Sequence, residues 1–259
     1  MKVALIQMEV VAGAVAENRE RGLRLARKAA SKADVVILPE IWTTGYSLRN
    51  VEEWAEDETG STLTGLKEIA QTFHTTIISG SIPFRQGGKI FNSACVMNQA
   101  GELIACYHKI HLFQFMGEER FFAPGWERCT FPVYGATAGL AICYDLRFPE
   151  LFRSLTMDGA SVIFVPAEWP GARGEHWRTL VQARAIENQV YICAVNCVGQ
   201  HRGNPFYGHS LLVSPGGDIL AKGGDGEEIV YGEIDLDQVS AIRQTMPVWA
   251  DRRPKMYRQ

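Results

Sequence analysis

Short, almost wholly apolar runs recur along this chain of 259 residues and alternate with segments of helical pattern. The runs at residues 34–39 and 160–165 are too short for ordinary helices and have no polar face. Strands of this kind are covered on both faces, which requires helices packed on a sheet. The repeated order of strand, helix and strand, together with hairpins, therefore predicts an α/β fold with a mixed sheet.

The remaining segments fit this fold class. Two pairs of strands, 89–97 with 103–107 and 208–213 with 219–221, are joined by short turn-rich connections and predict antiparallel hairpins. No linker, repeat or low-complexity stretch divides the chain, so we expect one domain over residues 1–259, with 246–259 as a C-terminal tail. Helices are expected at 14–32, 64–74, 149–157, 174–188 and 237–243, and further strands at 2–8, 76–82, 131–134, 140–142, 189–197 and 228–234.

Composition narrows the class of partner. The net charge is −3 and 46% of the residues are hydrophobic, which gives no reason to expect a nucleic acid or a membrane surface as partner. No apolar run approaches the length of a membrane span. A strand-like pattern begins at Lys2, so we expect no leader peptide and a cytoplasmic location.

Six cysteines are present, and none forms a C-x-x-C pair. Cys193 and Cys197 lie four residues apart in one expected strand and would share a face as core residues rather than as metal ligands. In a cytoplasmic chain we expect reduced thiols, and no zinc pattern is present. The other four are Cys95, Cys106, Cys129 and Cys143.

Cys143 lies where the apolar run 140–142 breaks into a helix that Pro149 can begin. A thiol at the carboxyl end of a strand projects into a crevice, next to turn N–H groups that can hold an oxyanion. An unpaired cysteine is more often a buried packing residue, so this position alone does not establish a nucleophile.

Two further reactive side chains end expected strands. Glu40 follows the run 34–39, and Lys109 follows the strand 103–107. In open α/β sheets, ligand sites gather at strand carboxyl ends. Taken singly, Glu40 fits a solvated carboxylate or the cap of a following turn better than a catalytic group, and Lys109 fits a solvated lysine better. His108 and His111 beside Lys109 fit surface imidazoles better than metal ligands.

Three sequence blocks together carry more information than any one residue. They are Leu38–Glu40, Tyr107–Phe113 and Cys143–Glu150. In these blocks and their order, from Lys2 to about Asp235, the chain resembles the nitrilase superfamily of carbon–nitrogen hydrolases. The resemblance implies a four-layer α-β-β-α sandwich with two mixed sheets. It also implies a homodimer.

The same resemblance implies roles for the matched residues. Cys143 would be the nucleophile, Glu40 the general base and Lys109 the group that stabilises the transition state. Glu118 matches a second glutamate that family members place beside the lysine, and Glu119 takes its place if the alignment shifts by one residue. No metal and no organic cofactor is expected.

These residue types suit amide hydrolysis, which covalent catalysis divides into two easier steps. The thiol of Cys143 attacks the carbonyl, Glu40 accepts its proton, and Lys109 with the backbone N–H of Tyr144 stabilises the oxyanion. Ammonia leaves, and water releases the acid from a thioester. A glutamate base needs a raised pKa, for which a second carboxylate such as Glu118 is one source.

The stretch from Pro166 to Asn188 resembles the omega-amidase branch, which hydrolyses the terminal amide of short dicarboxylic monoamides such as 2-oxoglutaramate. For the free carboxylate of such a substrate, Arg173 is the candidate, and a solvated loop arginine fits the position equally well. Trp42, Tyr46 and Trp169 are candidate pocket walls, with ordinary loop packing as the alternative. The alternatives are another small amide, a nitrile or a carbamoyl compound as substrate, or a non-catalytic binding protein.

Overall fold

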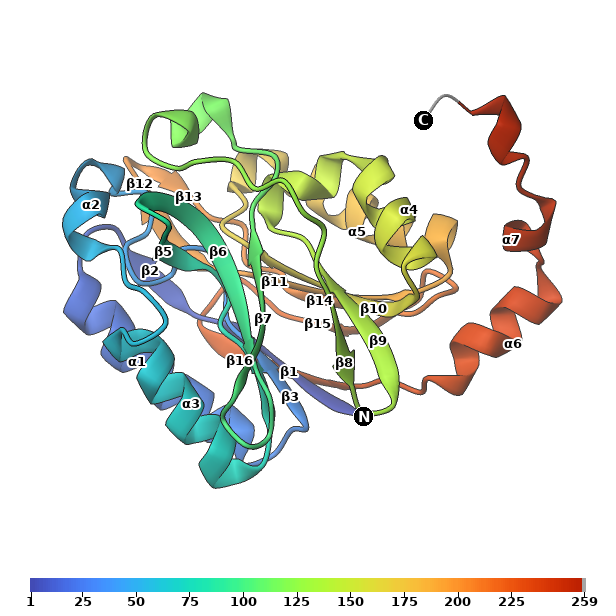
Figure 1. The fold of residues 1–259 in the computed structure, drawn as a ribbon, viewed down its shortest axis with the longest axis horizontal. Coiled ribbons are helices and arrows are strands. Elements are labelled where there is room, and N and C mark those ends of the chain that lie inside the picture. Colours follow the sequence, from blue (N-terminus) through green and yellow to red (C-terminus); the bar gives the residue numbers. More distant parts are fainter. Residues whose placement is uncertain (258–259) are drawn as a thin grey trace.

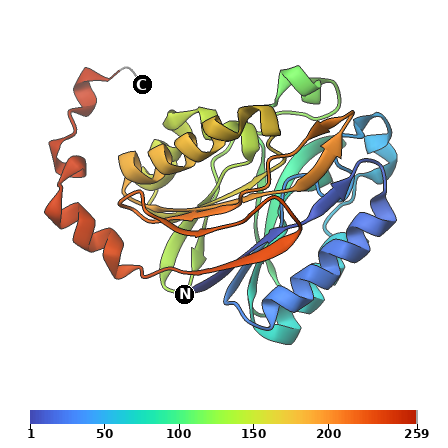
Figure 2. The same cartoon turned by 180° about the vertical axis from the view of Figure 1, so that it is seen from behind.

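In the computed structural model, which describes residues 1–257, two β-sheets pack face to face and α-helices cover their outer faces (Figure 1). This is the four-layer α-β-β-α arrangement that the resemblance implied. Figure 2 shows the same layers from behind, with α1 outside one sheet and α5 outside the other.

The first sheet has seven strands in the order β16-β1-β3-β4-β6-β5, with β7 paired to β6. The neighbours β1, β3 and β4 run parallel, and the other pairs are antiparallel. Its strands are β1 (Lys2–Gln7), β3 (Val35–Ile37), β4 (Thr76–Ile78), β5 (Ile82–Gln86), β6 (Lys89–Met97), β7 (Leu103–His108) and β16 (Glu228–Glu233).

The second sheet has six strands in the order β15-β14-β11-β10-β9-β8, with a parallel centre of β9, β10 and β11. Its strands are β8 (Thr130–Val133), β9 (Ala136–Leu140), β10 (Ala160–Ala167), β11 (Tyr191–Asn196), β14 (Leu211–Val213) and β15 (Ile219–Lys222). A small third sheet joins β2 (Glu9–Val11), β12 (Val198–His201) and β13 (Asn204–Pro205).

In the first sheet, alternation of side chains along the strands directs buried residues to opposite faces. In β1, Val3 and Leu5 belong to the core between the sheets, whereas Ala4 and Ile6 pack with the outer helices. The outer helices of the first sheet are α1 (Val15–Ala30) and α3 (Ser61–Phe73), and those of the second are α4 (Pro149–Met157) and α5 (Gly174–Asn188). Because both faces of each sheet are covered, the strands carry the continuous apolar runs seen in the sequence.

Most predicted elements are confirmed, including both antiparallel hairpins. Two boundaries were wrong. The strand before Cys143 is β9, which ends at Leu140, so the run 140–142 mostly follows the strand. The predicted strand 76–82 ends at Ile78, and β5, which was not predicted as a separate strand, begins at Ile82.

The expectation of six reduced cysteines was wrong for two of them. Cys95 and Cys106 form a disulfide, because the register of β6 and β7 places them directly opposite each other. The prediction that Cys193 and Cys197 share one face of a strand was also wrong. Both are buried, but Cys193 packs between the sheets and Cys197, one residue beyond β11, packs in the outer layer.

The C-terminal segment extends away from the sandwich as an arm (Figure 1). It contains α6 (Asp237–Thr245) and α7 (Val248–Asp251). The arm contacts the body where the Arg153 guanidinium of α4 lies 4.8 Å from the ring centre of Trp249. Part of the expected tail, residues 258–259, lies outside the described residues. Within residues 1–257, no helix is long and apolar enough to cross a membrane.

Candidate active site

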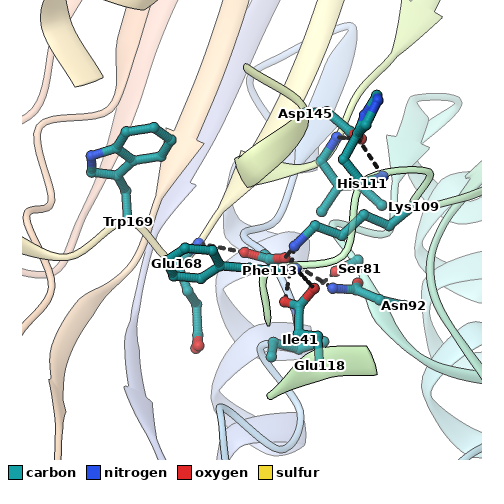
Figure 3. A network of polar contacts seen from close by, with 12 residues as sticks. Ile41, Ser81, Asn92, Lys109, His111, Phe113, Glu118, Asp145, Glu168 and Trp169 are labelled. Carbon is teal, nitrogen blue, oxygen red and sulfur yellow. Dashed lines mark hydrogen bonds and ion pairs between the residues drawn. The ribbon is translucent and has the colours of Figure 1, made fainter. Parts of the chain in front are cut away.

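Four candidate functional side chains follow the ends of strands in the two facing sheets. Lys109 directly follows β7, and Glu168 directly follows β10. Glu40 and Cys143 each come three residues after a strand, β3 and β9 respectively. The fold therefore brings the expected Glu, Lys and Cys together, as Figure 3 shows for the surroundings of Lys109.

Glu40 is fully buried, and both of its carboxylate oxygens are hydrogen-bonded. Oε1 accepts from Lys109 Nζ at 2.7 Å and from Asn92 Nδ2 at 2.9 Å. Oε2 accepts from the backbone N–H of Glu168 at 3.0 Å. These donors come from the interior of β6 and from the ends of β7 and β10, so the carboxylate is fixed in one orientation before any substrate binds.

Glu118, in the short 3-10 helix η3 (Glu118–Arg120), is the second glutamate beside the lysine. Its Oε1 accepts from Lys109 Nζ at 2.9 Å and from the Tyr46 hydroxyl at 2.8 Å, and its Oε2 accepts from the backbone N–H of Phe113 at 2.9 Å. Glu119 instead points outward, beside Arg120 at 3.6 Å. The geometry thus favours Glu118 over its neighbour.

Lys109 is fully buried between the two carboxylates. Burial lowers the pKa of its ammonium group, but the negative charges of Glu118 and Glu40 together outweigh burial, so its pKa lies above the usual value. Burial and the charge of Glu40 in turn raise the pKa of Glu118, against the opposing effect of Lys109. The lysine is therefore a fixed positive charge in the site.

Cys143 begins the 3-10 helix η4 (Cys143–Arg147) with a φ of 44°, in the left-handed region that non-glycine residues rarely adopt. Such strain concentrates at functional sites. Burial, followed by the charge of Glu40, raises the pKa of the thiol well above its usual value, with Lys109 opposing. The thiol therefore lies within reach of the charge of Glu40 and is neutral near pH 7.

Asp145 holds the turn that presents the cysteine, and sequence analysis missed this role. Its buried carboxylate accepts from the backbone N–H of Ile142 at 2.8 Å and from the Tyr107 hydroxyl at 2.7 Å. The Nδ1 atom of His111 lies 2.7 Å from the same carboxylate. Its position two residues after Cys143 was a weak signal, because the partners come from a distant strand.

His108 and His111, which were predicted to be surface imidazoles, are half-buried. His111 stacks on Phe148 with ring centres 3.6 Å apart, and His108 stacks on Phe91 at 4.2 Å. Both rings therefore have structural partners. Among the described residues, no group of three or more His, Cys, Asp or Glu side chains could hold a metal ion.

A cavity of about 800 Å³ opens beside this network. Its wall carries several cationic side chains and a number of aromatic ones. A much smaller cavity lies next to Cys143 and shares part of this wall, so the two form one path to the thiol. The shared residues are Phe113, Glu168, Pro170 and Arg173.

Most of the predicted pocket residues lie along this path. Tyr46 and Arg173 line the large cavity, and Tyr144 and Trp169 line the small one. Trp42 does not, so its prediction as a pocket wall was wrong. It is fully buried in the outer core, where its indole N–H donates to the Ser79 carbonyl at 2.7 Å, since its loop turns toward α1 rather than the cavity.

Arg173, in η5 (Gly171–Arg173), is held in place without an acidic partner. Its carbonyl accepts from the Trp169 indole N–H at 2.8 Å, and its guanidinium lies 5.2 Å from the ring centre of Phe115. No carboxylate within residues 1–257 pairs with it. The cationic group remains available to an anion in the cavity.

Glu168 is the second residue that sequence analysis missed. It lines both cavities and is 2% exposed. Its signal in the sequence was a carboxylate directly after the apolar stretch 160–167, a pattern similar to the one that singled out Glu40.

The chain is similar to known proteins along almost its whole length. The family model described as carbon–nitrogen hydrolase matches residues 2–244. The chain is 40% identical over 255 residues to the 2-oxoglutaramate amidase of Bacillus subtilis (strain 168), covering 98% of each protein. It is 34% identical over 266 residues to the human omega-amidase NIT2, covering 99% of this chain and 96% of that protein.

Solved structures show the same fold. XC1258 from Xanthomonas campestris, described as a CN-hydrolase superfamily protein with an arsenic adduct in the active site, has a TM-score of 0.91 and 31% identity over 98% of this chain and 97% of that chain. Nit3 of Saccharomyces cerevisiae, a member of branch 10 of the nitrilase superfamily, has a TM-score of 0.89 and 29% identity over 99% and 97%.

Proposed function

The chain belongs to the carbon–nitrogen hydrolase family of the nitrilase superfamily, and on this premise we propose that it hydrolyses the terminal amide of a small dicarboxylic monoamide. The model substrate is 2-oxoglutaramate, the compound named for the Bacillus subtilis relative. The products are the dicarboxylic acid and ammonia, and the reaction passes through a thioester on Cys143.

Attack begins from a neutral thiol, because burial and Glu40 hold the pKa of Cys143 high. Glu40 accepts the proton while sulfur attacks the amide carbon, so a free thiolate is never required. The carboxylate lies close enough to the thiol for its charge to raise the thiol pKa, which places the base beside the proton that it accepts. Lys109, Asn92 and the N–H of Glu168 hold the base still during the step.

The tetrahedral intermediate carries a negative charge on the former carbonyl oxygen. Lys109 is the cation of the site, and Tyr144 supplies a backbone N–H from the first turn of η4. We assign both to stabilisation of that oxyanion, because donors fixed in a site that excludes water lower the barrier most. The high pKa of Lys109 keeps it protonated throughout.

Collapse of the intermediate breaks the carbon–nitrogen bond, and Glu40 returns the proton to the leaving nitrogen, which departs as ammonia. Water then replaces ammonia at the same position. Glu40 removes a proton from this water, hydroxide adds to the thioester carbon, and the acid leaves as the proton returns to sulfur. The cycle consumes one water and needs no redox partner.

The cavity supports an anionic substrate. Arg173 lies on the wall shared with the small cavity beside Cys143, and a guanidinium can bind a carboxylate with two hydrogen bonds. Arg49 and Arg202 line the outer part of the large cavity. A substrate with an amide at one end and a carboxylate at the other fits this distribution of charge.

The observation that carries the proposal is the buried group of Glu40, Lys109 and Cys143 at the inner end of an arginine-lined cavity. The test is ammonia release from 2-oxoglutaramate by the wild type and by Cys143→Ala. Turnover by the wild type alone supports the proposal. Absence of turnover by the wild type removes the substrate, and full activity in Cys143→Ala removes the mechanism.

We further propose that residues 1–259 form a single hydrolase domain with residues 246–259 as its tail, and that the protein is a cytoplasmic homodimer. The arm exposes Met246 and Tyr257, two large apolar side chains suited to a contact with a second copy. Light scattering of the purified chain tests the dimer, and a monomer would contradict it.

A further inference from the structure

Glu168 has a buried side chain that the mechanism above does not use. Its backbone N–H donates to Glu40, so the main chain at this position serves the general base. Any residue except proline could supply that N–H. The choice of a glutamate side chain at position 168 therefore needs a separate reason.

No hydrogen bond fixes the carboxyl group of Glu168, although the buried thiol of Cys197 lies close enough to affect its pKa. Neither oxygen has a hydrogen-bond partner among residues 1–257, and both are shielded from solvent. In Figure 3 the side chain extends away from Lys109, and no dashed line reaches its carboxyl group. A buried polar group left in this way destabilises the fold, and such groups in native proteins indicate a functional role.

The position of Glu168 connects it to the substrate path. It lines the small cavity beside Cys143 and also the large cavity, together with Phe113, Pro170 and Arg173. A substrate whose amide carbon lies at Cys143 must extend past this shared wall. The remainder of its carbon chain then lies between Glu168 and Arg173.

The protonation state of Glu168 limits what it can bind. Burial, and then the charges of Glu40 and Glu118, raise the pKa of its carboxyl group well above the usual value, while Lys109 and Cys197 act in the opposite direction. A neutral carboxylic acid can donate a hydrogen bond to an oxygen atom of an anion. A carboxylate in the same place would repel it.

We propose that Glu168 is a substrate-recognition residue whose carboxylic acid donates a hydrogen bond to an oxygen atom in the anionic half of the substrate. This rests on the proposed function, since that function supplies the anionic half. The acceptor is a carboxylate oxygen or the oxygen of a 2-oxo group, which have the same hydrogen-bonding chemistry. Where the acceptor is the oxo oxygen, an ammonium group in its place offers no acceptor, and the site then selects 2-oxo acids over amino acids.

The first experiment compares Glu168→Leu and Glu168→Gln with the wild type. The substrates are 2-oxoglutaramate and glutaramate, which have the same length and differ only in the oxo group. For 2-oxoglutaramate, Glu168→Leu should raise KM about 10- to 100-fold with kcat within about threefold. Glu168→Gln keeps a donor and should raise KM less than about fivefold. Glu175→Leu, an exposed glutamate at the start of α5, is the matched control.

The two substrates identify the acceptor. If the acceptor is the oxo group, Glu168→Leu raises KM for 2-oxoglutaramate but not for glutaramate. If it is the carboxylate, KM rises for both. An unchanged KM for both substrates overturns the proposal. A fall in kcat at constant KM also overturns it, because that result means that position 168 acts only through Glu40.

A pH series covers the case in which Glu168→Leu fails to fold. Above its pKa, Glu168 becomes a carboxylate, loses its donor and repels the substrate, so KM of the wild type should rise at alkaline pH. Glu168→Gln removes this rise but leaves the other titratable groups facing the site, and an identical rise in both proteins contradicts the proposal. Those groups are Glu40, Tyr46, Lys109, Glu118, Cys143 and Cys197.

Calorimetric titration of 2-oxoglutarate into Cys143→Ala, with and without Glu168→Leu, separates the two proposals. Weaker binding of this product in the double variant, by about tenfold or more, supports recognition by Glu168 even where the wild type releases no ammonia. Turnover by the wild type with equal product affinity in both variants means that only the inference about Glu168 fails. Absence of both turnover and binding overturns both.

Discussion

The network around Lys109 and the cavity beyond Glu168 are both built from charged side chains, but they differ in how these are paired. In the network, both oxygens of Glu40 and of Glu118 accept hydrogen bonds. Along the cavity, the described residues provide no carboxylate partner for Arg173 and no donor for Glu168. The groups whose hydrogen bonds are satisfied are held in position for the reaction. The groups without partners are available to bind the substrate.

Substitution of the general base, Glu40, should give the largest loss of activity. Glu40→Gln keeps the shape of the side chain but removes its ability to accept a proton. We expect kcat to fall about 10³-fold or more, because one group serves both half-reactions, while KM changes little. Steady-state ammonia release measures the change. Retention of a tenth of the activity would mean that another group accepts the proton.

The second glutamate gives a smaller effect with a matched control. Glu118→Gln weakens the hold on Lys109, and misplacement of a catalytic group costs about 10²-fold, so we expect kcat to fall about 10- to 100-fold. Glu119→Gln, one residue along and paired only with Arg120, should remain within twofold of the wild type. Equal losses in the two variants would contradict the assignment of Glu118.

Substitutions in the cavity lined by Arg173 and Glu168 should change KM rather than kcat. Arg173→Met removes a charge-assisted contact and should raise KM for 2-oxoglutaramate about 10- to 100-fold. Butyramide, an amide without a carboxylate, should show no such change. Arg178→Met, on the exposed face of α5, is the control for loss of one positive charge. An equal effect on both substrates would show that Arg173 does not bind the carboxylate.

The smallest effect on activity is expected outside both regions. Trp42 lies against Gly22 of α1 in the outer core, so Trp42→Phe leaves a space there. We expect the free energy of unfolding to fall by about 1–3 kcal/mol, with KM within twofold of the wild type. Urea unfolding and steady-state kinetics measure the two quantities. A large rise in KM would return Trp42 to the pocket wall.

The sequence was informative where the apolar pattern of a strand and the side chain that follows it are adjacent in the chain. Apolar runs ending in Glu40, and sequence blocks around Lys109 and Cys143, indicated the α/β fold and the three side chains that the structure brings together. Partners from distant elements were not visible. Asp145 accepts a hydrogen bond from Tyr107 on β7, and the Cys95–Cys106 disulfide depends on the register between two strands.

Glu168 illustrates the same limit. Its position after a buried strand matches that of Glu40. Only the packed structure shows that the Glu40 carboxylate accepts hydrogen bonds whereas the Glu168 carboxyl group has no hydrogen-bond partner. Trp42 and Tyr46 lie four residues apart in one turn, and one faces the core while the other faces the cavity. Linear spacing in an irregular turn does not specify which direction a side chain takes.

Trapping of the acyl-enzyme tests the central claim most directly. Glutaramate is the substrate of choice, because it lacks an oxo group with which hydroxylamine would react. With the wild type, hydroxylamine should intercept the thioester and yield the hydroxamate of glutaric acid, while Cys143→Ala should form it at least about 10⁴-fold more slowly. Ammonia release by the wild type without any hydroxamate, or hydroxamate formation by Cys143→Ala at the wild-type rate, would contradict a thioester on Cys143.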